Sequence, residues 1–336
     1  MLGQIADKST NPYSTSARMT KIPPINLPDS ENPASLISHP YLLLVFAPLF
    51  WGANIVAGKL AVGHVDPYLL LVGRWLGATL IVLTIGVPHL RRDWPKIRPA
   101  LPMLSLYGVL GFATFNILMY NSAYFTAAVN ASIEQAAIPV VVLLANFLIF
   151  RVRAKALQIA GLVLTIIGVV WVATRGEPLR ILALDVNIGD GMVLLACLLY
   201  AAYSLMLKYR PDIHWLSFIL VTAAAALLAS LVFVLLIGGG FENLVQEIPQ
   251  TTLRGWGCIL YVMIFPSIVA QLCYARGVEL VGPNRASIFI NLLPVFGTIL
   301  SVIIIGESFE AYHVIASILV IAGIVLAEYA VLRRPR

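Results

Sequence analysis

The chain has 336 residues, of which 60% are hydrophobic and only 11% are charged, and its mean hydropathy is +0.91. A soluble domain of this length does not need so much apolar surface, so the composition predicts an integral membrane protein. The net charge of +6 does not indicate a nucleic-acid partner, because the basic residues fall at the ends of apolar segments, where membrane topology explains them.

Ten apolar segments follow one another between Tyr41 and Leu332. About 20 apolar residues in a helix cross a hydrocarbon core of about 30 Å, and backbone groups in lipid must bond within their own segment. We therefore expect an all-α fold in the lipid bilayer, with ten transmembrane helices. They are expected near residues 41–62, 67–88, 101–120, 127–150, 155–174, 189–207, 216–236, 257–274, 286–305 and 311–332.

The last five segments repeat the first five. Asn130-Ala-Ser-Ile-Glu-Gln-Ala-Ala-Ile-Pro-Val140 corresponds to Arg285-Ala-Ser-Ile-Phe-Ile-Asn-Leu-Leu-Pro-Val295, at an offset of 155 residues. Five crossings are an odd number, so the second copy must enter the membrane inverted. This predicts two inverted halves, 39–174 and 189–332, joined by a periplasmic linker at 175–188. Inverted repeats are typical of secondary transporters, whose substrate site lies where the halves meet.

Basic residues indicate the orientation. Clusters of Lys and Arg follow the second, fourth, sixth, eighth and tenth segments, whereas the opposite loops hold most of the acidic residues. The positive-inside rule then places both termini in the cytoplasm of a multi-pass protein of the cell inner membrane. Residues 1–38, rich in Ser, Thr, Asn and Pro, are expected to be a disordered cytoplasmic tail, and residues 333–336 a basic one.

Several short motifs carry a family resemblance. They are Phe50-Trp51-Gly52-Ala53-Asn54, Asp66-Pro67 followed by Arg74, the segments around Pro139 and Pro294, and Glu307 after the ninth segment. In this order and spacing they resemble the drug/metabolite transporter superfamily, in particular the EamA-like permeases, although Val152 replaces the acid in the first copy. The resemblance implies a central cavity lined by spans one, three, four, six, eight and nine, with spans five and ten outside it. It also implies efflux or exchange of a small metabolite.

Two ionisable residues lie inside predicted spans. Arg74 and Glu134 are each seven residues from the outer end of their span. A charge at such depth costs at least about 2.5–3.5 kcal/mol, so both are functional candidates. Equal depth leaves an Arg74–Glu134 ion pair open. Glu134 could instead bind an amino group or carry a proton, since desolvation favours the neutral acid whereas a nearby Arg favours the carboxylate.

Neutral polar and aromatic residues supply the other substrate-binding candidates. Asn116 and Gln271 are repeat partners, and each follows a residue that weakens a helix, Gly111 or Pro266. Trp51 and Tyr200 are also repeat partners, and they lie too deep to be interface anchors. For each of these residues the alternative is interhelical packing. The full candidate set is Trp51, Asn54, Asn116, Glu134, Gln135, Tyr200, Gln271 and Asn291.

An enzyme finds little support in the sequence. The three cysteines and five histidines have no metal-ligand spacing, and no nucleophile motif or phosphate loop is present, so we expect no cofactor and no metal. The sequence favours a transporter of an amino-acid-like or amphipathic drug-like molecule that works by alternating access. A lipid or lipid-linked carrier flippase of the same fold, a lipid-modifying enzyme and a non-transporting receptor remain alternatives. Faces of small residues, Gly161 with Gly168 and Ala316 with Gly323, leave a homodimer open.

Overall fold

The computed structural model describes residues 39–150, 156–177, 179 and 187–332, and its regular elements in these ranges are all helices. The two predicted tails, 1–38 and 333–336, and residues 178 and 180–186 of the predicted linker lie outside the described residues.

The helices match the ten predicted spans in order. Eight described helical stretches are long and apolar enough to cross a membrane, and one of them, Pro67–Ser122, has 56 residues and contains the second and third predicted spans. A shorter apolar helix at Ala311–Ala327 corresponds to the tenth. The count is therefore compatible with ten crossings. The first, fifth, sixth, seventh and tenth spans are helices α1 (Pro40–Ala61), α6 (Ala156–Ala173), α7 (Ile188–Met206), α8 (Trp215–Leu236) and α14 (Ala311–Leu332).

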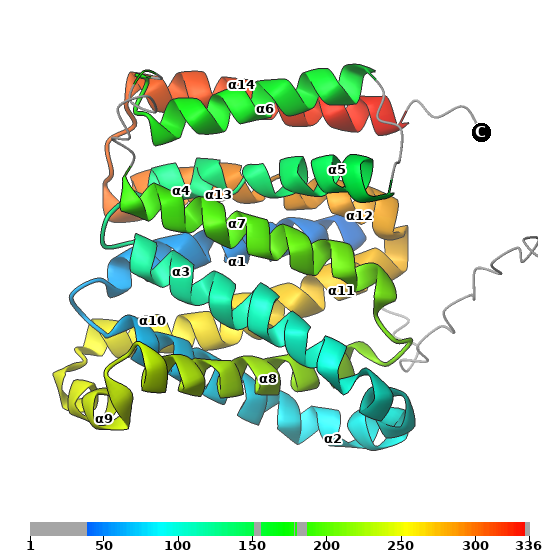
Figure 1. The fold of residues 1–336 in the computed structure, drawn as a ribbon, viewed down its shortest axis with the longest axis vertical. Coiled ribbons are helices and arrows are strands. Elements are labelled where there is room, and N and C mark those ends of the chain that lie inside the picture. The colour runs from blue at the N-terminus through cyan, green and yellow to red at the C-terminus, as the bar shows by residue number, and fades with distance from the viewer. Residues whose placement is uncertain (1–38, 151–155, 178, 180–186, 333–336) are drawn as a thin grey trace, which may run out of the picture. The chain divides into compact units, whose positions relative to one another are not determined.

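Two helical segments were not predicted. Helix α2 (Pro67–Tyr107) continues through the expected connection at 89–100, and four prolines lie inside it between residues 88 and 102. Proline removes a backbone donor and bends a helix, and the chain turns back in this region before α3 (Phe115–Ser122) (Figure 1).

The second unpredicted segment is helix α9 (Gly240–Gln250), which lies between α8 and α10 (Leu253–Ile264) in the chain. It exposes Phe241, Val245 and Ile248 along one stripe, as expected of a helix lying in a membrane interface.

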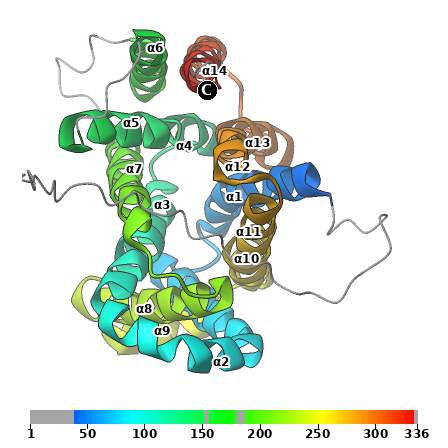
Figure 2. The same cartoon turned by 90° about the vertical axis from the view of Figure 1, so that its right-hand side faces the viewer.

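Helices α6 and α14 pack side by side at one edge of the bundle, and α2 packs against α8 at the other (Figures 1 and 2). The first contact depends on small residues. A Cβ atom added to Gly161 would clash with the carbonyl oxygen of Gly323 and would lie 2.8 Å from the backbone nitrogen of Ala327. The predicted close approach of the small-residue faces therefore occurs within one chain.

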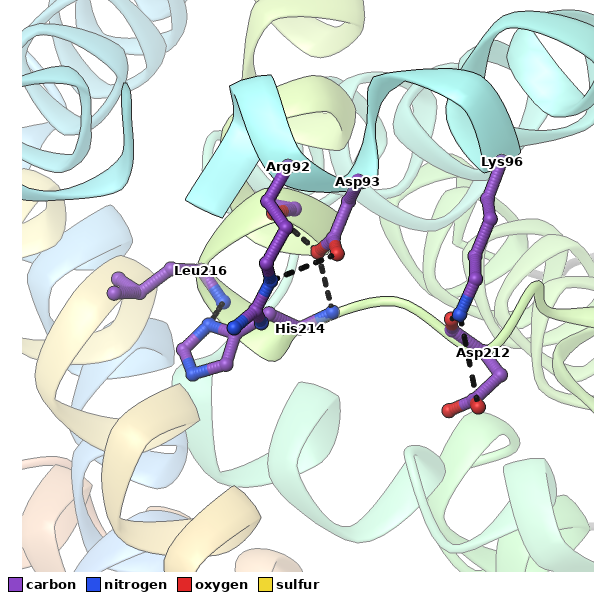
Figure 3. A network of polar contacts seen from close by, with 7 residues as sticks. Arg92, Asp93, Lys96, Asp212, His214 and Leu216 are labelled. Atoms are coloured by element: carbon purple, nitrogen blue, oxygen red, sulfur yellow. Dashed lines mark hydrogen bonds and ion pairs between the residues drawn. The ribbon is translucent and has the colours of Figure 1, made fainter. Parts of the chain in front are cut away.

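A polar network joins the end of the second span to the start of α8 (Figure 3). Asp93 accepts hydrogen bonds from the His214 backbone N–H at 2.7 Å and the Ser217 hydroxyl at 2.8 Å. Burial alone would raise the pKa of Asp93, but these bonds and nearby Arg92 outweigh it and hold this pKa below its ordinary value. The His89 and His214 rings stack with their centres 3.9 Å apart. Burial, followed by the charges of nearby His89 and Arg92, lowers the pKa of His214 to about 4. A neutral His214 can therefore accept the Leu216 N–H and cap α8.

Candidate functional site

Four of the predicted spans are irregular near the middle of the bundle. The fourth divides into α4 (Ala128–Glu134) and α5 (Ala137–Phe150), and the ninth into α12 (Pro283–Ile290) and α13 (Leu293–Leu300). The third and eighth contain π-helical segments, η2 (Gly108–Thr114) and η5 (Phe265–Val269), at the two predicted weak points. A π-helical segment η6 (Ser301–Ile305) follows α13. Irregular backbone at membrane depth is tolerated where protein or a cavity satisfies its polar groups.

A cavity of about 90 Å³ lies among these irregular segments, large enough for several water molecules or a small ligand. Seven of the eight predicted substrate-binding residues line it: Trp51, Asn54, Asn116, Gln135, Tyr200, Gln271 and Asn291. Gln135 and Asn291 occupy the breaks in the fourth and ninth spans. The lining includes the six spans that the family resemblance implies. The lining also includes Arg74 and Trp75 of α2, a span that the resemblance did not assign to the cavity. It includes Ile324 of α14 as well, although the resemblance placed that tenth span outside the cavity.

Arg74 is the centre of the polar part of this cavity. Asp66 and Pro67 begin α2, with the Asp66 side chain accepting from the N–H groups of Tyr68 and Leu69, and Arg74 follows two turns later. Only 4% of Arg74 is exposed. Its Nε donates to Ser267 Oγ at 2.8 Å, and its Nη1 lies within 2.6–2.8 Å of three oxygen atoms, those of Asn54, Asn116 and Tyr120. Asn54 and Asn116 therefore hold Arg74 in place with their side-chain oxygens.

Aromatic rings form the apolar part. The rings of Trp51 and Tyr274 lie 5.6 Å apart, and those of Phe115 and Tyr200 lie 5.1 Å apart. Trp51 also donates its indole N–H to the Pro266 carbonyl in η5 at 3.2 Å, so the π-helical segment fixes one wall of the cavity. The guanidinium carbon of Arg74 lies 4.9 Å from the centre of the Trp75 ring. The lining thus combines one cation, a few amides and several aromatic faces.

Glu134 differs from its prediction in two respects. It is fully buried, and it is not among the residues that line the cavity, although the next two residues are. Neither of its carboxyl oxygens has a hydrogen-bond partner in the described part of the chain, so the suggested ion pair with Arg74 does not form. Glu134 is the last residue of α4, and its backbone carbonyl accepts a hydrogen bond from the Cys197 thiol of α7 at 3.7 Å.

Two charged residues set the position of α4. Both carboxylate oxygens of Glu307 accept backbone N–H groups at the start of α4, from Ala128 at 2.9 Å and Val129 at 2.8 Å. Lys59 donates to the carbonyls of Ala123 and Thr126 in the preceding turn, at 2.7 and 2.8 Å. Negative charge at a helix N-terminus is stabilising. This gives Glu307, which belongs to the motifs above, a structural role.

Sequence reasoning missed Tyr120, Ser267 and Trp75. Tyr120 ends its predicted span, a position typical of interface anchors, yet it is 1% exposed and accepts a hydrogen bond from Arg74. Ser267 looks like an ordinary small residue, and its neighbour Pro266 was the only local signal. Because both contacts join residues far apart in the chain, no local pattern could reveal them.

Comparisons with known proteins agree with this architecture. The profile of the EamA-like transporter family matches residues 39–174 and 187–329. The uncharacterized transporter YyaM of Bacillus subtilis is 23% identical over 302 residues, covering 88% of this chain and 95% of its own length. The uncharacterized transporter YetK of the same organism is 25% identical, covering 84% and 85%.

A crystal structure with 17% sequence identity covers 86% of this chain and 96% of its own, with a TM-score of 0.58, and it supports the fold alone. The relatives' names point to a transporter rather than an enzyme. With the helical membrane fold and the family profile covering most of its length, the chain belongs to the EamA-like transporter family.

Proposed function

We propose that this protein is a secondary transporter of the inner membrane that exports or exchanges a small metabolite by alternating access. The observation that carries the proposal is the cavity, because residues from both family-matched ranges line it. Trp51, Asn116 and Gln135 come from the first range, and Tyr200, Gln271 and Asn291 come from the second. A site where two halves meet is accessible from either side when one half moves against the other.

The helix breaks supply the flexible points that such a movement needs. Gln135 and Asn291 combine a side chain in the cavity with a position at a break in their span. Rotation of α5 or α13 about these breaks would change the cavity wall directly. The halves are proposed to be 39–174 and 189–332 in opposite orientations, with both termini in the cytoplasm, as the basic residues of the sequence predict.

Proton coupling is proposed at Glu134. An ionised carboxylate without a donor is costly to bury, so the buried position suits the neutral acid, and proton release would require the wall behind the cavity to rearrange. Contacts with α4 and the turn before it bring several charged or titratable side chains to this region. They are Asp190 and Cys197 of α7, His313 of α14, Lys59 of α1 and Glu307.

The test compares extracellular metabolites of cells that overproduce the intact protein or one of two tryptophan variants. Ile138→Trp fills the cavity, whereas Leu148→Trp on the same helix replaces a side chain that is 63% exposed. We expect a compound to accumulate outside cells that make the intact protein or Leu148→Trp, but not outside cells that make Ile138→Trp. Equal extracellular profiles at equal amounts of protein in the membrane would contradict export.

A further inference from the structure

Among the described residues that line the cavity, Arg74 is the only one that carries a charge. The other polar lining residues are amides and neutral aromatics, with no Asp or Glu in the described lining. The second, smaller cavity beside it, which shares Asn54, Ile55 and Met119 with the first, adds Lys59 and likewise no acid. Among the described residues the cavity therefore has an excess of positive charge.

The hydrogen bonds of Arg74 do not neutralise that charge. Its four acceptors are a serine hydroxyl, two amide oxygens and a phenol oxygen, all of them uncharged. They satisfy donors, but a buried cation without an anion nearby remains unfavourable. Arg74 and Glu134 do not form an ion pair, since neither carboxyl oxygen of Glu134 has a partner among the residues that the structure describes.

Part of the guanidinium is also without an acceptor. An arginine has five N–H donors, and the four contacts described here are made by three of them, the one N–H of Nε and the two of Nη1. The two N–H groups of Nη2 have no acceptor among the described residues, and Nη2 is not one of the fully enclosed orphan atoms of this part of the chain. The nitrogen thus has room beside it in a residue that is 96% buried and lines the cavity.

We propose that the cargo is a small monocarboxylate whose carboxylate group binds Arg74 at Nη2 and whose apolar body lies between the aromatic faces of Trp51, Phe115 and Tyr200. This rests on the proposed transport function and names the substrate class of the same site. A charged hydrogen bond from guanidinium to carboxylate supplies the missing anion. With a single cation, the cavity suits one negative charge and disfavours a free amine cation.

Three probes of similar shape test the charge preference on the purified full-length protein at neutral pH. Benzoate is an anion, benzamide is neutral and benzylamine is a cation, and butyrate, butyramide and butylamine repeat the series on an aliphatic body. Binding is measured as the ligand-dependent rise in the unfolding midpoint, which follows from mass action. We expect at least one carboxylate to bind about ten-fold more tightly than its amide and amine, the value of one hydrogen bond to a charged group.

Arg74→Gln should abolish this preference and Arg74→Lys should retain part of it. Arg254→Gln removes an exposed arginine outside the cavity and should leave the preference intact. Two results on the intact protein alone would overturn the proposal. One is that the amides or amines bind as tightly as the carboxylates or more tightly, and the other is that no probe binds. If Ile138→Trp still blocks export in that case, transport stands and the substrate class is wrong. If carboxylates bind through Arg74 but no compound is exported, the ligand class stands and the proposed export is wrong.

Discussion

Arg74 and Glu134 look equivalent in the sequence, at the same depth and with opposite charge, but the structure gives them different surroundings. Arg74 has four hydrogen-bond acceptors and lines the cavity. Glu134 is fully buried, does not line the cavity, and has no partner for its carboxyl oxygens in the described part of the chain. Sequence spacing gives depth along a helix but not rotation about it, because rotation depends on which helices become neighbours. The sequence therefore identified the candidates and could not decide their pairing.

At Glu134 we predict that Glu134→Gln abolishes flux driven by a pH gradient, because glutamine keeps the shape of the side chain but cannot release a proton. Flux in proteoliposomes should fall to the level of protein-free vesicles when the gradient is the driving force. Exchange of cargo without a gradient should persist, which shows that the variant is folded. Glu242→Gln, an exposed acid of α9, serves as the matched control and should behave as the intact protein does. Gradient-driven flux that survives Glu134→Gln would remove Glu134 from the coupling step.

Among the helices, length and apolarity were predictable but interruptions were only partly so. Gly111 and Pro266 suggested weak points, and each lies in a π-helical segment. The breaks after Glu134 and Ile290 had a less direct signal, because Pro139 and Pro294 lie inside α5 and α13 but remove the N–H donors for the carbonyls four residues earlier, at Gln135 and Ile290. Helix α9 was missed because its apolar stripe is only a few residues long and is interrupted by acids and amides. Such segments are defined by what packs on them rather than by composition.

The contact between α6 and α14 makes a prediction at Gly161. Gly161→Ala places a methyl group against the backbone of α14, so we expect a loss of about 1–3 kcal/mol, the usual cost of overpacking. Gly191→Ala is the matched control on α7, because nothing lies within 4 Å of its added Cβ. It should be neutral or stabilising by up to about 1 kcal/mol, since alanine favours a helix. The unfolding midpoint in detergent measures both, and equal midpoints would show that this contact is looser than described.

Across the whole molecule, composition and the repeat predicted the membrane fold, a number of spans with which the helices are compatible, and seven of the residues that line the cavity. They did so because apolar length is fixed by the bilayer and because a repeat brings equivalent positions such as Asn116 and Gln271 to the centre. The cavity's charge balance was not predictable, since it depends on Glu134 lying outside the lining and on Tyr120 and Ser267 contacting Arg74. The inverted relation of the halves and the cytoplasmic termini stay predictions.

The most direct test of alternating access is the reactivity of one cysteine in the cavity toward a membrane-impermeant thiol reagent. Cys197, Cys258 and Cys273 are first replaced by alanine, and Ile138→Cys then places a thiol in the cavity. The reagent is applied from outside in intact cells and from the cytoplasmic side in inverted vesicles. The account predicts labelling of Ile138→Cys from both sides and none of Leu148→Cys, which faces away on the same helix. Labelling of Ile138→Cys from one side only would contradict it.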